Sequence, residues 1–490
     1  MKTLPRTMDH VCAVLVLCAT TAIALPAQTF TTLYTFCSQS GCTDGEYPNL
    51  GLVQATDDNF YGTTSSGGKS NQGTVFKITP QGALTTLHSF CPQAPCSGGS
   101  QPAAGLVQAT NGYLYGTTYT SSGGSEGGTV FKITLGGKLT TLYTFCSQGS
   151  YPYCPDGTFP QAALVQATNG DLYGTTLGGG SDNCTNGCGT VFKITPSGTL
   201  TTLYSFCSQS GCTDGASPYA GLVQATNGDL YGTTFNGGTK NSGTVFKITP
   251  SGTLTTLHSF CSQEGPDGCM DGFFPWTVLV QATNGYLYGT TVAGGGSENA
   301  GTIFKITPSG KLTTLYSFCS LSGGCPYAGA AGLGLVQATD GNLYGTDSGN
   351  AEAQNGTVYE MTPSGTLTTV YGFPDSGIAG PLVQATNGDF YGTGCCGGQH
   401  PEGVVGSLST GLGPFLKTLP ASGKVGTAVK ILGTNLTGAT SVGFNGTAAL
   451  FRVASSSEIT TTVPVGASSG TVQVVTPSGT LSTYVAFTVP

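Results

Sequence analysis

The chain has 490 residues, of which only 8% are charged, while 79 are glycine and 18 are cysteine. This length allows two or three domains of ordinary size. The formal net charge of −8, with no basic cluster, argues against nucleic acid as a partner.

Residues 1–27 are predicted to be a secretory signal peptide. Lys2 and Arg6 supply the basic start, an apolar run centred on Val11–Leu17 follows, and small residues such as Ala27 offer cleavage sites. The run is short for a membrane span, and no later stretch is long and apolar enough to cross a membrane. We therefore expect an exported protein, secreted or at the cell surface, with no transmembrane segment after the signal is removed.

One sequence unit recurs through residues 28–409. The segment Leu-Val-Gln-Ala-Thr occurs seven times, and Tyr-Gly-Thr follows each copy. The copies begin at Leu52, Leu106, Leu164, Leu222, Leu279, Leu335 and Leu382. Recurrence of a unit of this size is the sequence signature of a repeat architecture.

Each unit is predicted to form four antiparallel strands. In the copy that begins at Leu222, the strands are Gly221–Thr226, Asp229–Thr233, Thr244–Thr249 and Leu254–Phe260. Asn227-Gly228 favours a tight hairpin turn between the first two strands, and β-branched and aromatic residues fill the others.

The two ends of the repeat region complement each other. Thr31–Phe36 matches the fourth strand of a unit but precedes the first copy, whereas the seventh copy stops after a degenerate third strand near Val404–Leu408. Ends of this kind favour a ring over an open stack, because closure leaves no unpaired sheet edge. The predicted fold is an all-β, seven-bladed β-propeller closed by the N-terminal strand, with a β-solenoid or prism-like array as the alternative.

Sixteen cysteines follow the signal, mostly in close pairs, as expected for disulfides in an oxidising compartment. The candidate pairs are Cys37/Cys42, Cys91/Cys96, Cys146/Cys154, Cys184/Cys188, Cys207/Cys212, Cys261/Cys269 and Cys319/Cys325. Pairing of the adjacent Cys395 and Cys396 stays open, because neighbouring Cα atoms lie closer than an ordinary disulfide requires. Zinc is the competing interpretation of such pairs, but the sequence shows no clustered second ligand pair.

The cysteine pairs and most acidic residues fall in the longer loops, which an up-and-down sheet places on one face. This cysteine-bearing face is the predicted binding face, because ligands usually bind to loops on a rigid scaffold. Asp44, Asp156, Asp214 and Asp271 each precede a glycine in these loops. An Asx turn is the structural interpretation, and ligation of calcium or sugar hydroxyls, or carboxylate catalysis, are the functional ones.

Two further residue types bear on this face. Trp276 is the only tryptophan and is a candidate for stacking on a sugar, although nearby aromatics could also pack the sheets together. His88 and His258 replace tyrosines of the sister strands and are interpreted as structural substitutes.

Residues 412–490 lack the repeat and show short alternating strands between Gly, Ser and Asn turns, which predicts a small β-sandwich. The stretches GKVGTAVKILGTNLTGATSVGFNGTAA and VPVGASSGTVQVVTPSG resemble an IPT/TIG domain, an immunoglobulin-like fold. This resemblance implies a spacer or interaction module.

The repeat pieces NGxLYGTT, GTVFKITPxG and LTTLYSF resemble the GloVer tandem repeat of bacterial exported proteins, whose members often carry a cell-surface anchor. We expect a non-enzymatic, disulfide-stapled binding or adhesion scaffold, whose partner is a polysaccharide or another surface protein. No cofactor is expected, except that calcium could be bound. The alternatives are a carbohydrate-active enzyme, either a glycoside hydrolase or a lyase, and a self-assembling structural surface protein.

Overall fold

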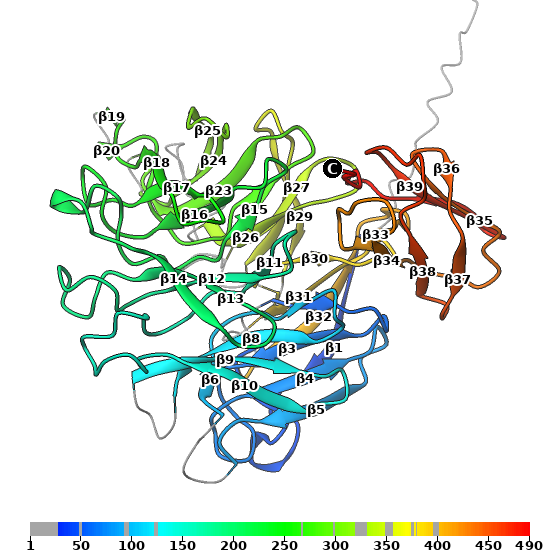
Figure 1. Ribbon diagram of the computed structural model, residues 1–490, viewed down its shortest axis with the longest axis horizontal. Helices are drawn as coiled ribbons and strands as arrows, with labels where there is room; N and C mark the ends of the chain where they lie inside the picture. The colour runs from blue at the N-terminus through cyan, green and yellow to red at the C-terminus, as the bar shows by residue number, and fades with distance from the viewer. Residues whose placement is uncertain are drawn as a thin grey trace, which may run out of the picture.

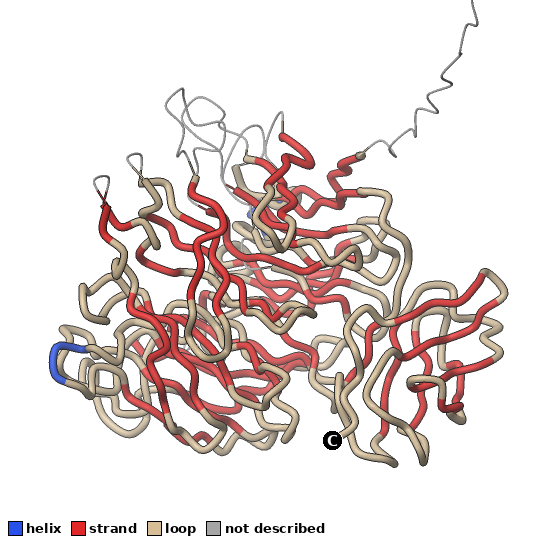
Figure 2. Tube along the Cα trace, turned by 90° about the horizontal axis from the view of Figure 1, so that it is seen from above, coloured by secondary structure: helices blue, strands red, loops and turns tan. Residues whose placement is uncertain are grey.

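The computed structural model describes residues 28–490, except for 49–50, 93–97, 122–125, 266–267, 297–298, 319–330, 348–355, 374–376, 379 and 395–400. The predicted signal peptide therefore lies outside the described residues. The described chain is built of β-strands, with the short 3-10 turns η1 (Ser40–Cys42) and η3 (Ser210–Cys212) in its loops (Figures 1 and 2).

Each repeat forms one antiparallel sheet. The first two sheets contain β2 (Val53–Gln54), β3 (Phe60–Thr64), β4 (Thr74–Ile78) and β5 (Leu84–Ser89), then β6 (Ser100–Pro102), β7 (Val107–Gln108), β8 (Leu114–Thr120), β9 (Glu126–Ile133) and β10 (Leu139–Thr144). The third and fourth contain β11 (Val165–Gln166), β12 (Leu172–Thr176), β13 (Thr190–Ile194) and β14 (Leu200–Ser205), then β15 (Val223–Gln224), β16 (Leu230–Thr234), β17 (Thr244–Ile248) and β18 (Leu254–Ser259).

The hairpin β19 (Glu264–Gly265) and β20 (Gly268–Cys269) precedes the fifth sheet. The fifth and sixth sheets contain β21 (Phe273–Pro275), β22 (Val280–Gln281), β23 (Leu287–Ala293), β24 (Thr302–Ile306) and β25 (Leu312–Ser317), then β26 (Ala331–Gln337), β27 (Leu343–Asp347), β28 (Thr357–Met361) and β29 (Leu367–Gly372). The seventh contains β30 (Val383–Gln384), β31 (Phe390–Gly394), β32 (Val404–Ser409) and β1 (Thr29–Thr35). Consecutive strands pair within these sheets, except that β6 and β21 pair with β8 and β23, and β1 pairs with β32.

The predicted four-stranded unit is present, with its first strand shorter than expected. In the fourth repeat this strand covers Val223–Gln224 only, because Ala225 already turns and donates its N–H to the Asp229 carbonyl at 2.9 Å. Gly228 has φ 87° in that turn, a left-handed conformation that glycine adopts without steric cost. The Asn-Gly turn therefore starts earlier than the sequence pattern indicated.

Strand β1 joins the two ends of the repeat region. It pairs antiparallel with β32, from Thr29 opposite Ser409 to Thr35 opposite Val404 (Figure 1). The orphan N-terminal strand thus supplies the outer strand that the seventh repeat lacks, as its sequence predicted.

The hydrophobic core lies between neighbouring sheets. Buried side chains of each sheet pack against those of the next, and a further cluster joins the last repeat to the first through Phe36, Leu52, Phe76, Tyr391 and Val405. In this cluster the Phe36 and Phe76 rings meet edge to face at 5.1 Å. Each repeat consequently buries its apolar face only in the presence of its neighbours.

A glutamine in every Leu-Val-Gln-Ala-Thr segment links neighbouring repeats. The Gln108 side-chain oxygen accepts the Thr56 backbone N–H at 2.9 Å, and the same bond joins Thr386 of the seventh repeat to Gln54 of the first at 3.0 Å. The intervening contacts are Thr110 to Gln166, Thr168 to Gln224, Thr226 to Gln281, Thr283 to Gln337 and Thr339 to Gln384. In each repeat the threonine N–H lies in the tight turn, where no neighbouring strand accepts its hydrogen bond. The glutamine of the next repeat satisfies this donor.

The C-terminal region forms two packed sheets beside the repeats (Figure 1). One contains β33 (Lys417–Leu419), β34 (Ala428–Leu432), β38 (Glu458–Thr462) and β37 (Phe451–Val453), and the other β36 (Thr447–Ala448), β35 (Ser441–Phe444), β39 (Val472–Thr476) and β40 (Gly479–Ser482). Ile431, Val442, Phe444, Ile459 and Phe487 fill the core between them. This is the β-sandwich that the sequence predicted.

Candidate functional site

Disulfide bonds fasten the loops of the cysteine-bearing face. The bonds described are Cys37–Cys42, Cys146–Cys154, Cys184–Cys188, Cys207–Cys212 and Cys261–Cys269. Cys91 is also disulfide-bonded, but its predicted partner Cys96 lies outside the described residues, as do Cys319, Cys325, Cys395 and Cys396. These bonds fit an extracellular protein. Among the described residues, no helix is long and apolar enough to cross a membrane.

The Asp214 carboxylate is buried and anchors its loop. It is 0% exposed, and its Oδ2 accepts hydrogen bonds from the Tyr204 hydroxyl at 2.7 Å and from the Ser208 N–H and hydroxyl, each at 2.9 Å. Its Oδ1 accepts the Gln209 N–H at 3.3 Å. Asp44 and Asp156 are equally buried and accept the same hydroxyl and backbone bonds from Tyr34 and Ser38, and from Tyr143 and Ser147.

Asp271 shows the same arrangement with histidine in place of tyrosine. His258 Nε2 lies 3.0 Å from Asp271 Oδ2, in the position that the tyrosine hydroxyl takes in the other repeats. Burial opposes ionisation of Asp271, but hydrogen bonds from His258, Ser262 and two backbone N–H groups outweigh it and hold its pKa below the usual range. The interpretation of His258 as a structural substitute is confirmed.

These contacts give all four aspartates a structural role, but not the predicted Asx turn, in which the aspartate would bond a backbone group two residues after it. Their hydrogen-bond donors come from residues that precede each aspartate, so the carboxylate closes the loop backwards onto the end of the fourth strand. Ligand binding by Asp44, Asp156, Asp214 or Asp271 stays a prediction.

Four aromatic rings gather where the fourth and fifth repeats meet. Trp276 is 43% exposed and lies 5.2 Å from the Tyr219 ring and 5.8 Å from the Phe235 ring, measured between ring centroids. Phe235 stacks on Phe274 at 4.6 Å. Tyr219, Phe235 and Phe274 are half-buried; the Tyr219 and Phe235 rings contact the indole directly, and Phe274 contacts it only through Phe235. We name these four residues the aromatic surface.

The aromatic surface breaks the uniformity of the repeats. Trp276 and Tyr219 each follow the proline that precedes the first strand, and the corresponding residues of the first three repeats are Asn49, Ala103 and Gln161. Phe235 belongs to the loop between β16 and β17, Phe274 to the short strand β21, and Tyr219 and Trp276 to the segments that precede β15 and β22. The Phe235–Phe274 stack has a counterpart in the Tyr119–Phe159 stack at 4.7 Å, between the second and third repeats. Among the described residues, this site is therefore distinguished by Tyr219 and the exposed indole of Trp276.

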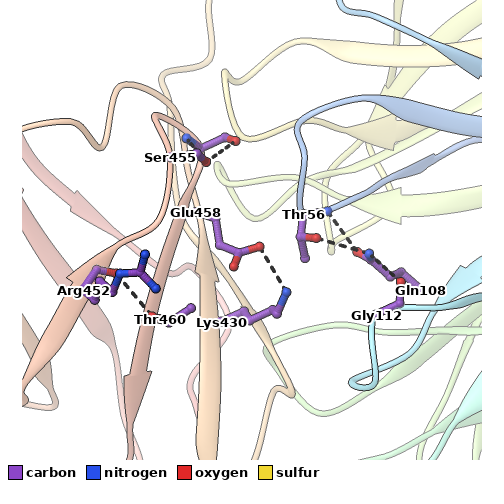
Figure 3. Close-up of polar contacts among 9 residues, drawn as sticks. Thr56, Gln108, Gly112, Lys430, Arg452, Ser455, Glu458 and Thr460 are labelled. Atoms are coloured by element: carbon purple, nitrogen blue, oxygen red, sulfur yellow. Dashed lines mark hydrogen bonds and ion pairs between the residues drawn. The ribbon is translucent and has the colours of Figure 1, made fainter. Parts of the chain in front are cut away.

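A second candidate site lies between the first repeat and the sandwich. A cavity of about 500 Å³ is lined by the turns at 56–59 and 79–81 of the first repeat and by residues 454–458 of the sandwich. Figure 3 shows Glu458 on the sandwich side and Thr56 on the repeat side. Glu458 pairs with Lys430 at 3.2 Å. The turns involved are the tight ones, so this cavity does not lie on the cysteine-bearing face that the sequence predicts for binding.

Asp58 departs from the other repeats at this cavity. It has φ 68° where the corresponding residues Gly112, Gly170, Gly228, Gly285 and Gly388 also have positive φ. Its carboxylate accepts a hydrogen bond from the Gln54 side chain at 2.8 Å. Burial and the neighbouring Asp57 raise the pKa of Asp58, whereas the Gln54 bond opposes that rise. The left-handed backbone conformation is higher in energy for aspartate than for glycine. The first repeat therefore carries local backbone strain at Asp58.

The sandwich docks on the last two repeats at the ends of their first strands and at the tight turn that follows, where backbone carbonyls accept its hydrogen bonds. The Lys417 ammonium donates to the Gln384 carbonyl and lies 5.4 Å from the Phe415 ring centroid. The Tyr484 hydroxyl donates to the Gln337 carbonyl at 3.2 Å, and the Phe415 N–H to the Thr386 carbonyl at 3.0 Å. Burial lowers the pKa of Lys417 to about 8.

This pKa predicts a pH dependence of stability. Between pH 8 and the unfolded pKa of about 10.5, the unfolded chain binds more protons at Lys417 than the folded chain does, so this residue's contribution to stability rises with pH. We expect Lys417→Met to remove a rise of up to about 3 kcal/mol across that window. Urea unfolding of both proteins at several pH values measures it, with Lys424→Met as the control on an exposed lysine. Parallel pH profiles for wild type and Lys417→Met would contradict the buried-ammonium assignment.

The repeats match a family model described as the Gloeobacter/Verrucomicrobia repeat, over residues 20–183, 153–269, 184–405 and 267–450. The chain belongs to this repeat family. An IPT/TIG domain model matches residues 415–489, which are the sandwich. Both resemblances drawn from the sequence are thereby confirmed. No curated relative matches the chain.

Several solved structures are similar to this repeat-family chain at low identity. A virginiamycin B lyase variant from Staphylococcus aureus is 14% identical, with a TM-score of 0.48, over 78% of this chain and 99% of that one. A fungal alcohol oxidase in complex with copper is 12% identical, with a TM-score of 0.48, over 94% and 99%. A 6-phosphogluconolactonase-like protein from Bacteroides fragilis is 16% identical, with a TM-score of 0.42, over 70% and 87%.

Sequence reasoning missed three features of these sites. The glutamine contacts had a visible signal, because the same residue stands in all seven Leu-Val-Gln-Ala-Thr segments. The Asp57-Asp58 replacement of Asn-Gly was also visible in the first repeat. The docking of the sandwich onto the last two repeats left no signal, because backbone carbonyls accept most of its hydrogen bonds.

Proposed function

We propose that this repeat-family protein is an exported, non-enzymatic scaffold that binds polysaccharide through the aromatic surface around Trp276. The observation that carries the proposal is the exposed indole held by Tyr219 and Phe235 at 5.2 and 5.8 Å. Aromatic faces present large, rigid contact area with few rotatable bonds. The exposed part of the indole can stack on the apolar face of a sugar ring, while Tyr219 and Phe235 contact the rest of it.

We infer that the repeats form a closed, seven-bladed β-propeller. The pairing of β1 with β32 and the glutamine contact between Gln54 and Thr386 support closure, and the seven copies of the repeat support the blade count. Closure fixes the fourth and fifth repeats relative to each other, which a shared binding surface between them requires.

Export and a binding role are supported by independent features. The predicted signal peptide at residues 1–27 and the disulfide-fastened loops both favour an oxidising, extracellular compartment. The aspartates proposed for carboxylate catalysis are occupied by hydrogen bonds from their own loops, which favours binding over hydrolysis. A carbohydrate-active enzyme and a self-assembling surface protein remain the alternatives that the following experiment separates.

Trp276→Ala is expected to weaken binding of the purified protein to its polysaccharide by roughly 30-fold, the loss typical of a central aromatic anchor. A glycan array, with and without calcium and with a reduced sample, identifies the polysaccharide, and isothermal calorimetry measures the change. Tyr286→Ala is the matched control, because Tyr286 is 36% exposed in the tight turn between β22 and β23 of the same repeat.

Three outcomes would overturn the proposal. Equal binding by Trp276→Ala and wild type would remove the aromatic surface as the site. Release of shortened or unsaturated sugars from the bound polysaccharide would establish the enzyme alternative. Failure to bind any glycan, together with concentration-dependent growth of the particle in light scattering, would favour self-assembly.

A further inference from the structure

Two disulfides lie side by side in the third repeat. Cys184–Cys188 is in the loop between β12 and β13, and Cys207–Cys212 is in the connection between β14 and β15. The four Sγ atoms all lie within 4.8 Å of one another. The sequence had shown no clustered second pair beside any cysteine pair, and the fold supplies one here.

The surroundings of these sulfurs are apolar and fixed. Cys188 and Cys207 are 0% and 2% exposed and belong to the hydrophobic cluster between the third and fourth repeats, where Phe206 packs with them. The Asn183 side chain donates to the Cys207 carbonyl at 2.8 Å, and the Ser217 N–H donates to the Cys188 carbonyl at 2.8 Å. These bonds tie the two loops together without using the disulfides.

The spacing and separation suit a tetrahedral thiolate site. Structural zinc ligands commonly occur as Cys pairs with about two to four intervening residues, at Zn–S distances of about 2.3 Å. The sequence separations of 4 and 5 leave three and four intervening residues, which fall in that range, whereas the Cys261–Cys269 separation of 8 leaves seven and does not. A regular tetrahedron of such bonds places sulfurs about 3.8 Å apart, within the 4.8 Å that encloses all four.

We propose that these four cysteines form a redox-controlled site for one zinc ion. In the oxidised protein the sulfurs are paired with each other and hold no metal. Each disulfide takes two electrons and two protons from a dithiol, which becomes a cyclic disulfide, and the four thiols then release four protons as their thiolates bind Zn²⁺. Among the described residues, only the third repeat brings two cysteine pairs together; Cys37 and Cys42 have Glu46 beside them but no second pair.

Cobalt binding to the reduced protein tests the proposal directly. The purified protein is reduced with a phosphine, which itself becomes the phosphine oxide, and is titrated with Co²⁺ without oxygen. We expect the intense visible bands of tetrahedral thiolate-bound Co²⁺ at one equivalent, and their loss when Zn²⁺ is added. In the double variant Cys184→Ser/Cys188→Ser, the cobalt affinity is expected to fall by roughly 100-fold or more. Loss of groups that only hydrogen-bond to metal ligands already lowers metal affinity by about 10- to 100-fold, and loss of two ligands should lower it at least as much.

Two comparisons make the result decisive. The variant Cys261→Ser/Cys269→Ser, which removes an isolated pair, is expected to keep the tetrahedral bands. Zinc is expected to protect Cys184, Cys188, Cys207 and Cys212 of the unaltered protein from alkylation, as read by mass spectrometry of the peptides, while Cys146 and Cys154 react. Absent bands, bands that survive in the Cys184/Cys188 variant, or uniform alkylation would each overturn the proposal.

Discussion

Removal of β1 is expected to unfold the seventh repeat and to destabilise the whole repeat domain. A chain that begins at Cys37 leaves the β32 edge without its partner from Thr29 to Thr35. It also loses Leu33, Tyr34 and Phe36 from the cluster with the first repeat, and Phe30 from the cluster with the sixth. Burial of that much apolar surface contributes on the order of 5 kcal/mol or more, so we expect a strongly lowered urea midpoint and aggregation through the open edge.

A synthetic peptide of residues 28–37 provides the control for this deletion. Added to the shortened protein, it is expected to restore the unfolding midpoint by pairing with β32, as peptides do when they add a strand to an exposed sheet edge. A peptide with Phe30, Leu33 and Phe36 replaced by serine is expected not to do so. An unchanged midpoint in the shortened protein would contradict closure of the ring by this strand.

Asp214→Ala is expected to destabilise the protein by roughly 3 to 5 kcal/mol. The substitution leaves the Ser208 and Gln209 N–H groups and the Tyr204 hydroxyl without their charged acceptor inside a buried loop. Denaturant unfolding monitored by tryptophan fluorescence measures the loss. Asp214→Asn, which keeps one carbonyl acceptor, is expected to lose less.

Asp229→Ala is the matched control, because Asp229 lies in the tight turn between β15 and β16 of the following repeat, 3.8 Å from Lys247. Its change is expected to stay within about 1 kcal/mol. The pair also tests the prediction that Asp214 binds ligand. If Asp214→Ala unfolded like Asp229→Ala and yet abolished glycan binding, Asp214 would be a ligand-binding residue and the structural assignment would be wrong.

The sequence predicted those parts of the fold that depend on local pattern and repetition. Alternating apolar residues and Asn-Gly turns placed the strands of the fourth repeat to within about two residues, which is the ordinary uncertainty of strand ends. The match of Thr31–Phe36 to a fourth strand predicted the pairing of β1 with β32, because only the seventh repeat lacked that strand.

The candidate sites depended on contacts that the sequence does not encode locally. Asp214 bonds to Ser208 and Tyr204, and only the folded loop brings these groups together. The approach of Cys184 and Cys188 to Cys207 and Cys212 depends on how two loops fold over the end of one sheet. Trp276 was identified from its rarity, but its neighbour Phe235 comes from a different repeat and was not.

The glutamine contacts between repeats have a consequence for how such a chain can evolve. Each unit contributes both residue types that form these contacts. Its glutamine accepts the threonine N–H of the preceding unit, and its own threonine N–H donates to the glutamine of the following unit. Duplication or loss of one whole unit therefore leaves every remaining junction with the same two residues. Gene duplication can change the length of this array without any compensating substitution, and only the curvature between neighbours has to adjust.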